Sequence, residues 1–328
     1  MPTESREITF AQAINEALHE EMRRDELVFV IGEDVGRPGG VYKLTEGLFA
    51  EFGAERVMDS PISEAGIVGV GVGAAMTGLR PVVEIMFGDF LTLAMDQLVN
   101  QAAKVHYMSG GKLQVPLVIR TTMGAGRRAA AQHSQSLYAW FSHIPGLQVV
   151  VPSTPYDAKG LLKTAIRNSN PVIFFEDKMM YRMTGPVPGD EYVLPLGVAD
   201  IKRQGEDITL IAMSSMIHVA LEAATRLETE GIRAEVIDPR TLTPLDEQTL
   251  IESAIKTSRC IVIDEAYQRF GASAEIASVV SKGAFYHLDA PVERLAAMDV
   301  PIPFSPDLED LTIPNVDQVV ELARDMIR

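Results

Sequence analysis

The chain has 328 residues, 47% of them apolar, and a formal net charge of −16. This length is enough for two domains with separate cores, and the scattered Lys and Arg argue against a nucleic-acid or anionic-membrane partner. The single cysteine, Cys260, excludes an internal disulfide and fits a reducing compartment. The N-terminus lacks a signal-peptide core, and the longest uncharged run, 65–79, is too short to span a bilayer, so we expect a soluble, cytoplasmic protein.

The first half of the chain alternates between helical and strand patterns. Apolar residues at helical spacing predict a helix over residues 10–24. Further helices are expected at 45–52, 90–108 and 157–168. Strands are expected at 28–31, 56–58, 81–87, 115–120, 147–151 and 171–175. This alternation predicts a parallel α/β sheet with helices on both faces.

A glycine-rich stretch, residues 59–78, lies in the middle of this half. Ser60-Pro61 is a helix-start signal, and the apolar composition that follows predicts a buried helix with Glu64 in its first turn. Glu64 then has two interpretations: a carboxylate that stabilises the helix N-terminus, or a buried acid with a raised pKa that can take part in proton transfer. Gly69-Val-Gly-Val-Gly-Ala74 loosely matches a dinucleotide-binding pattern, but the Pro61 start puts these glycines inside the helix rather than in a strand-to-helix turn.

Three other positions have open interpretations. His133 lies in a loop, 121–136, that follows a strand, where open parallel sheets bind ligands, and it is about as well explained as a hydrogen-bonded loop residue. Asn168-Ser-Asn-Pro171 is either a capping turn or a source of carbonyls for a monovalent cation. Cys260 is expected to be a core side chain.

The helix and strand periodicity stops between 178 and 197, where a breaker cluster occupies 185–189. After it, strands are expected at 208–212, 234–238, 260–264 and 292–296. Helices are expected at 219–230, 247–256, 272–281 and 316–326. We therefore predict two α/β domains, 1–185 and a smaller 201–328, joined by a linker at 186–200.

Several stretches, in order over nearly the whole chain, together resemble one family. They include Gly32-Glu-Asp-Val35, Asp59-Ser-Pro-Ile-Ser-Glu-Ala65, Gly78-Leu-Arg-Pro81 with Glu84 and Phe90, Tyr107-Met-Ser-Gly-Gly111, Gln132-His-Ser-Gln135 and Asp299-Val-Pro-Ile-Pro303. The chain resembles the β subunit of the thiamine-diphosphate-dependent 2-oxoacid dehydrogenases. The resemblance implies a pyrimidine-binding domain followed by a transketolase C-terminal-type domain, acting in an α2β2 heterotetramer.

The resemblance also implies roles for individual residues. Glu64 corresponds to the glutamate that hydrogen-bonds N1′ of the cofactor's aminopyrimidine. Phe90 corresponds to the aromatic residue that stacks on this ring, with Phe87 as a close alternative. His133 corresponds to the histidine over the thiazolium, which handles protons and assists acyl transfer to a lipoyl group. The family holds a potassium ion, mainly through backbone oxygens, at the positions of Leu117, Ala165, Ile166, Asn168 and Asn170.

The chain has no Gly-Asp-Gly stretch of the kind that binds Mg²⁺ and diphosphate in this class of enzyme. The resemblance therefore implies that an α subunit holds the Mg²⁺ and that a lipoyl acyltransferase core is a further partner. Pyruvate is the first expectation for the substrate, acetoin the second, and a branched-chain 2-oxoacid remains open. Arg127 and Arg128 depart from the family's pattern without a firm interpretation, and both shaping of substrate access and pairing with the α subunit remain open. The alternative from a different functional class is that the chain is a non-catalytic scaffold protein.

Overall fold

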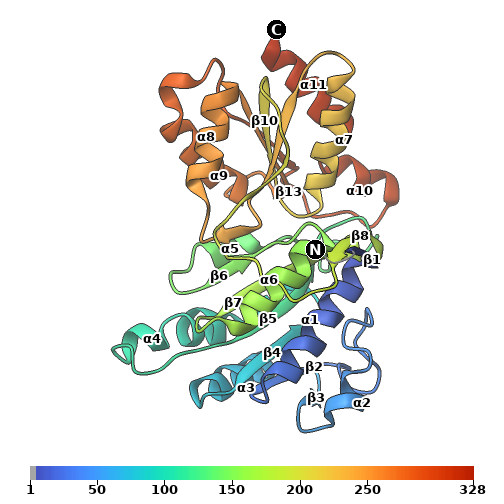
Figure 1. The fold of residues 1–328 in the computed structure, drawn as a ribbon, viewed down its shortest axis with the longest axis vertical. Helices are drawn as coiled ribbons and strands as arrows, with labels where there is room; N and C mark the ends of the chain where they lie inside the picture. Colours follow the sequence, from blue (N-terminus) through green and yellow to red (C-terminus); the bar gives the residue numbers. More distant parts are fainter. Residues whose placement is uncertain (1–4) are drawn as a thin grey trace. The chain divides into compact units, whose positions relative to one another are not determined.

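The computed structural model describes residues 5–328 and divides into two compact units. The first unit contains the chain up to Met123 together with Trp140–Leu196, and the second contains Gly124–Ala139 together with Gly197–Arg328. The second unit therefore includes a segment from within the predicted first domain. The helices and strands of both units are labelled in Figure 1.

The first unit is built on a parallel sheet. Its strands are β2 (Val28–Gly32), β3 (Val57–Asp59), β4 (Arg80–Ile85), β5 (Val118–Met123), β6 (Gln148–Val150) and β7 (Val172–Asp177). They lie in the order β6-β7-β5-β4-β2-β3, and every one of these pairs is parallel. The parallel α/β arrangement predicted from the alternating pattern is confirmed.

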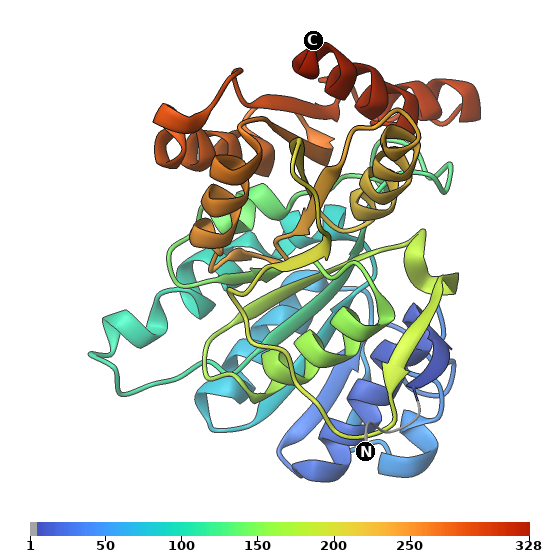
Figure 2. The ribbon, with the colours of Figure 1, turned by 45° about the horizontal axis from the view of Figure 1, so that its top comes forward.

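Helices cover both faces of this sheet. α1 (Phe10–Arg24) and α6 (Pro155–Arg167) pack side by side and share a core with Val82 of β4. α3 (Glu64–Met76) lies on the opposite face, because its Gly71 packs against Val83, the next residue of the same strand. Both views show α6 lying across the strands (Figures 1 and 2).

α1 begins and ends where the sequence predicts. Thr9 and Gln12 form a reciprocal capping box at its N-terminus, and its apolar side chains face the core at helical spacing. Local signals and tertiary packing agree here.

Two helix predictions in this unit differ from the structure. The predicted glycine-rich helix is present with Glu64 in its first turn, but it begins at Glu64 rather than at Ser60-Pro61, and one of its faces is exposed in this chain, with Val70 52% exposed. The predicted helix over 90–108 is instead three short pieces: a 3-10 helix η1 (Gly88–Ala94), a π-helical η2 (Gln97–Ala102) and α4 (Val105–Met108). Because α3 packs against both η1 and η2, tertiary packing overrides the regular helical propensity of this segment.

The second unit is a smaller sheet with helices on both faces. Strands β10 (Ile208–Ala212), β11 (Ala234–Asp238), β13 (Cys260–Tyr267) and β14 (Glu293–Ala297) form parallel pairs, and β9 (Asp200–Arg203) adds an antiparallel edge, in the order β14-β13-β10-β11-β9. Figure 1 shows α7 (Met216–Glu228) and α11 (Val316–Ile327) on one side of β10 and β13, with α8 (Glu247–Thr257) and α9 (Ala272–Gly283) on the other. Burial raises the pKa of the Cys260 thiol to about 12, as expected for a core cysteine.

The remaining elements are short. They are β1 (Ser5–Thr9), α2 (Leu48–Phe52), α5 (Tyr138–Ser142), η3 (Met180–Arg182), β8 (Thr184–Pro188), β12 (Thr241–Thr243), η4 (Phe285–His287) and α10 (Pro306–Thr312). β1 and β8 pair antiparallel, so the first residues of the predicted linker, 186–188, are strand. Across residues 5–328, no helix combines the length and apolar character that crossing a membrane requires.

Candidate active site

The first candidate residues lie at the carboxyl ends of the parallel strands. The Gly36 N–H donates to the Asp59 carboxylate at 2.7 Å, and the Ser60 N–H donates to the Gly32 carbonyl at 2.9 Å. A Cβ at Gly36 would lie 2.5 Å from Oδ2 of Asp59, so a larger residue there would force this carboxylate to move. The segment that leads into Glu64 is therefore fixed to the edge of the sheet.

Glu64 is the first residue of α3 and is only 8% exposed. Its carboxyl has no hydrogen-bond or ion-pair partner among residues 5–328, and Ser63 occupies the N-cap without a side-chain capping bond. Glu33 directly follows β2. Burial raises the pKa of its carboxyl, and the nearby negative charges of Glu64 and Asp34 raise it further. The capping interpretation of Glu64 lacks the expected hydrogen bond, and Glu33 is a nearby acid that the sequence did not single out.

Two phenylalanines lie beside α3, on or next to η1. The rings of Phe87 and Phe90 meet edge to face at 5.5 Å between centroids, and the Lys178 ammonium lies 5.7 Å from the centroid of Phe87. A cation over an aromatic face stabilises the pair and covers that face. The Lys178 ammonium thus lies over a face of the Phe87 ring.

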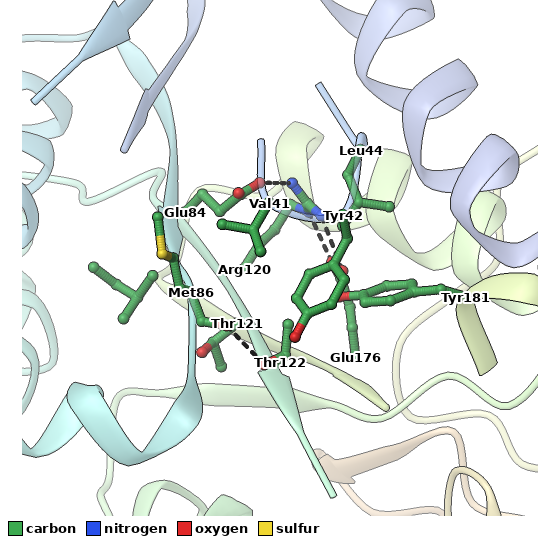
Figure 3. Close-up of a pocket in the computed structure, with 11 residues that line it drawn as sticks. Val41, Tyr42, Leu44, Glu84, Met86, Arg120, Thr121, Thr122, Glu176 and Tyr181 are labelled. Atoms are coloured by element: carbon green, nitrogen blue, oxygen red, sulfur yellow. Dashed lines mark hydrogen bonds and ion pairs between the residues drawn. The ribbon is translucent and has the colours of Figure 1, made fainter. Parts of the chain in front are cut away.

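A buried ionic network links β4, β5 and β7 (Figure 3). The Arg120 guanidinium, 1% exposed, donates to Glu84 at 2.8 Å and to both carboxylate oxygens of Glu176 at 2.7 and 2.9 Å. The Tyr181 hydroxyl adds a fourth bond, at 2.8 Å, to Glu176. Burial raises the pKa of Glu84, and the neighbouring Arg120 charge opposes that rise.

This network surrounds a cavity of about 10 Å³, which is room for one water molecule. Tyr42 and Thr121 also line it, and the buried Thr121 hydroxyl has no hydrogen-bond partner among the described residues. The sequence patterns did not predict this network. Only Glu84 was a signal, as a charged residue within a predicted strand, and the structure makes Arg120 its direct neighbour across the sheet.

We predict that Arg120→Met destabilises the protein by about 3–5 kcal/mol, because Glu84 and Glu176 would remain buried without a cation. Adding Glu176→Gln to this variant should recover part of the loss, since one of the two uncompensated charges disappears. Urea unfolding followed by circular dichroism measures both effects. Arg269→Met, at a side chain that is 74% exposed, is the control and should change stability by less than about 0.5 kcal/mol. Equal stability of Arg120→Met and wild type would contradict this account.

The residues expected to hold potassium meet where α6 ends and β5 and β7 begin. The Leu117 carbonyl accepts the Val172 N–H at 2.8 Å, and Asn168 is the C-cap of α6, so the capping interpretation of this turn is confirmed. The Arg80 guanidinium donates to the carbonyls of Ile166 and Asn168, both at 2.9 Å. These oxygens fit a potassium ion only in part, because two of them already accept hydrogen bonds from a cationic side chain.

We predict that Arg80 provides the positive charge at this corner. Arg80→Met should lower Tm by roughly 3 °C or more, because two charge-assisted hydrogen bonds are lost. Exchanging potassium for choline in the buffer should leave the Tm of the wild type unchanged within about 1 °C. Differential scanning calorimetry tests both, and a rise of several degrees that only potassium gives to the wild type would show that the ion, not Arg80, stabilises this turn.

His133 lies in the second unit, within the segment Gly124–Ala139. It is half-buried, and its backbone N–H donates to the Ala130 carbonyl at 3.4 Å. Further along the segment, the Ser136 hydroxyl donates to Glu265 at 2.9 Å and the Tyr138 hydroxyl donates to Asp264. His133 is therefore part of a segment held by buried carboxylates.

Among the described residues, no group of three His, Cys, Asp or Glu side chains is placed to hold a metal ion.

Two family models match successive parts of the chain. Residues 6–184 match the model described as "Transketolase, pyrimidine binding domain", and residues 197–319 match "Transketolase, C-terminal domain". The chain belongs to the transketolase family. The predicted fold class, two transketolase-type α/β domains, is thereby confirmed.

Within the transketolase family, the chain is similar over its whole length to β subunits of dehydrogenases. It is 52% identical to the acetoin:2,6-dichlorophenolindophenol oxidoreductase subunit beta of Bacillus subtilis (strain 168), with 98% of each chain covered. It is 50% identical to the pyruvate dehydrogenase E1 component subunit beta of Rhizobium meliloti (strain 1021), covering 98% of this chain and 70% of that protein. It is 48% identical to the 2-oxoisovalerate dehydrogenase subunit beta of the same Bacillus strain. The predicted membership of this β-subunit group is confirmed.

A solved structure titled "Split gene transketolase, inactive beta4 tetramer" aligns with a TM-score of 0.79 at 24% identity, covering 98% of both chains. At this level of identity the likeness supports the fold alone.

Proposed function

We propose that this chain is the β subunit of a thiamine-diphosphate-dependent component that oxidatively decarboxylates pyruvate and transfers the acyl group to a lipoyl group. The observation that carries the proposal is Glu64, a buried carboxyl at a helix N-terminus that has no hydrogen-bond partner among the described residues. A buried acceptor without a partner is unfavourable by itself, so a ligand that shares a proton with it is strongly favoured.

The residues of the first unit fit the aminopyrimidine half of thiamine diphosphate. When bound, this cofactor supplies an electron sink for breaking the bond between a carbonyl carbon and its neighbour. The Glu64 carboxyl can hold or share a proton at one of its oxygens, and its buried position in the first turn of α3 gives that proton a defined place. Phe90 offers a planar apolar surface next to α3. In the second unit, His133 is the proposed group for proton handling during acyl transfer.

The proposed activity requires partner proteins. Because the chain lacks a Gly-Asp-Gly stretch, we propose that an α subunit in an α2β2 heterotetramer holds the diphosphate and its Mg²⁺. The β chain alone should then be inactive. A lipoyl acyltransferase core is the proposed acceptor of the acyl group, and a cytoplasmic location is proposed from the composition.

Acetoin is the second candidate substrate. The observation in its favour is the 52% identity, over 98% of both chains, to the acetoin oxidoreductase subunit from Bacillus subtilis. Because relatives of 48–52% identity have pyruvate, acetoin and 2-oxoisovalerate in their names, a direct comparison of the three substrates decides between them.

The decisive experiment combines this chain with an α subunit that contains Gly-Asp-Gly and measures reduction of an artificial electron acceptor with each substrate. Activity should require both chains, and pyruvate should give the highest kcat/KM. Glu64→Gln should lower kcat by about 10²–10⁴-fold, the usual contribution of a positioned acid or base.

The matched control is Glu55→Gln, which changes an exposed glutamate outside the site and should keep full activity. Glu64→Gln should leave the melting temperature of the apoprotein unchanged or raise it, since it removes a buried charge that has no partner among the described residues. Full activity of Glu64→Gln would show that this residue has a structural role only. Inactivity of the assembled wild type on all three substrates would favour the scaffold alternative.

A further inference from the structure

The segment that carries His133 is attached to the second unit through an ionic contact that the proposed function does not explain. Its central residue is Glu309 of α10, whose side chain is fully buried. One carboxylate oxygen of Glu309 accepts the Gly126 N–H at 2.7 Å. The other accepts the Arg128 N–H at 3.2 Å and the Arg128 guanidinium at 2.7 Å. A single buried carboxylate thus holds two backbone amides and one cation.

Arg128 strengthens this attachment from the segment side. Its guanidinium also forms a bidentate pair with Asp310, at 2.6 and 3.0 Å, and donates to the Pro306 carbonyl at 3.2 Å. All these partners lie on α10, so one side chain contacts the helix at three residues. Bidentate arginine–carboxylate pairs fix orientation as well as distance.

The backbone at Arg128 is in a conformation that favours glycine. Its φ is 57°, in the left-handed region, which costs a residue with a Cβ roughly 1–2 kcal/mol. An arginine at such a position is favourable only where the contacts of its side chain contribute more stabilising free energy than the backbone conformation costs. The contacts with Glu309 and Asp310 provide this stabilisation.

We infer that Arg128 and Glu309 form a latch that fixes the segment Gly124–Ala139 on α10 and so positions His133. Ser136 and Tyr138 hold the other end of the segment through Glu265 and Asp264, so His133 lies between two attachment points. The inference rests on the proposed function, because it assigns His133 a task that needs a defined position. Arg128 is thus a positioning residue, five positions from the histidine, and this accounts for the arginine that the sequence analysis left without a firm interpretation.

The test compares Arg128→Gly, Arg128→Ala and Arg127→Ala in the assembled α2β2 enzyme. Arg128→Gly is the informative variant, because it relieves the backbone strain while it removes the side chain. Hydrogen–deuterium exchange of peptides that contain Gly126 and Arg128 reports the latch directly, independently of activity. Steady-state kinetics with the preferred substrate reports the position of His133.

We expect exchange in this segment to become about tenfold faster or more in both Arg128 variants, as for the loss of a charge-assisted hydrogen bond. kcat should fall by about fivefold or more with little change in KM, because a misplaced group costs rate rather than substrate binding. Arg127→Ala, at the exposed neighbouring position, should match the wild type in both measurements.

Wild-type exchange and kcat in Arg128→Gly would overturn the inference, since the backbone conformation alone would then suffice. Faster exchange with unchanged kcat would also overturn it, because the latch would not position His133. A wild type inactive on every substrate would remove the proposed function and the role of the latch with it, and the exchange data would still show whether Arg128 holds the segment.

Discussion

Parallel pairing of the strands in the first unit brings their carboxyl ends to one edge of the sheet, and the candidate residues of this unit depend on that constraint. Glu33 follows β2, the segment that leads into Glu64 follows β3, and Phe90 follows β4. Helices on both faces make the strands nearly continuous apolar runs, so polar groups are concentrated where the strands end. The same geometry places Glu64 at the N-terminus of α3 without an internal partner.

The protein treats its buried charges in two different ways. In the network of Arg120, Glu84 and Glu176, every charge has a partner, and the result is a rigid connection between three central strands. At Glu64 the burial has no such compensation among the described residues, and its charge raises the pKa of Glu33 nearby. A compensated network stabilises the fold, whereas a buried acid without a partner is unfavourable until a ligand shares a proton with it. This contrast, more than the presence of a glutamate, is the physical argument for Glu64 as a proton-transfer group.

Most of the fold could be predicted from the sequence, because local patterns determined it. α1 has a capping box and a regular apolar stripe, and its predicted limits are those of the structure. The helix predicted over 90–108 failed because its packing against α3, not its local propensity, decides its geometry. The predicted strand ended at Arg120, so this residue looked like a strand terminus, whereas β5 continues to Met123 and buries it.

The candidate site was predictable only in part. The resemblance placed Glu64, Phe90 and His133 in the chain, and the structure adds the environment of each. The contact between Arg128 and Glu309 joins residues 181 positions apart, and no local pattern signals a pairing at that separation. The partners of Glu64 and the identity of the substrate depend on groups outside this chain, which a single sequence does not contain.

We propose above all that Glu64 controls proton transfer in the bound cofactor. The most direct measurement is the rate of deuterium exchange at the thiazolium C2 position of thiamine diphosphate bound to the assembled α2β2 enzyme, for wild type and Glu64→Gln. A fall of about 10²–10⁴-fold in the variant, with the cofactor still bound, is the predicted result. Equal exchange rates in the two proteins would contradict the account.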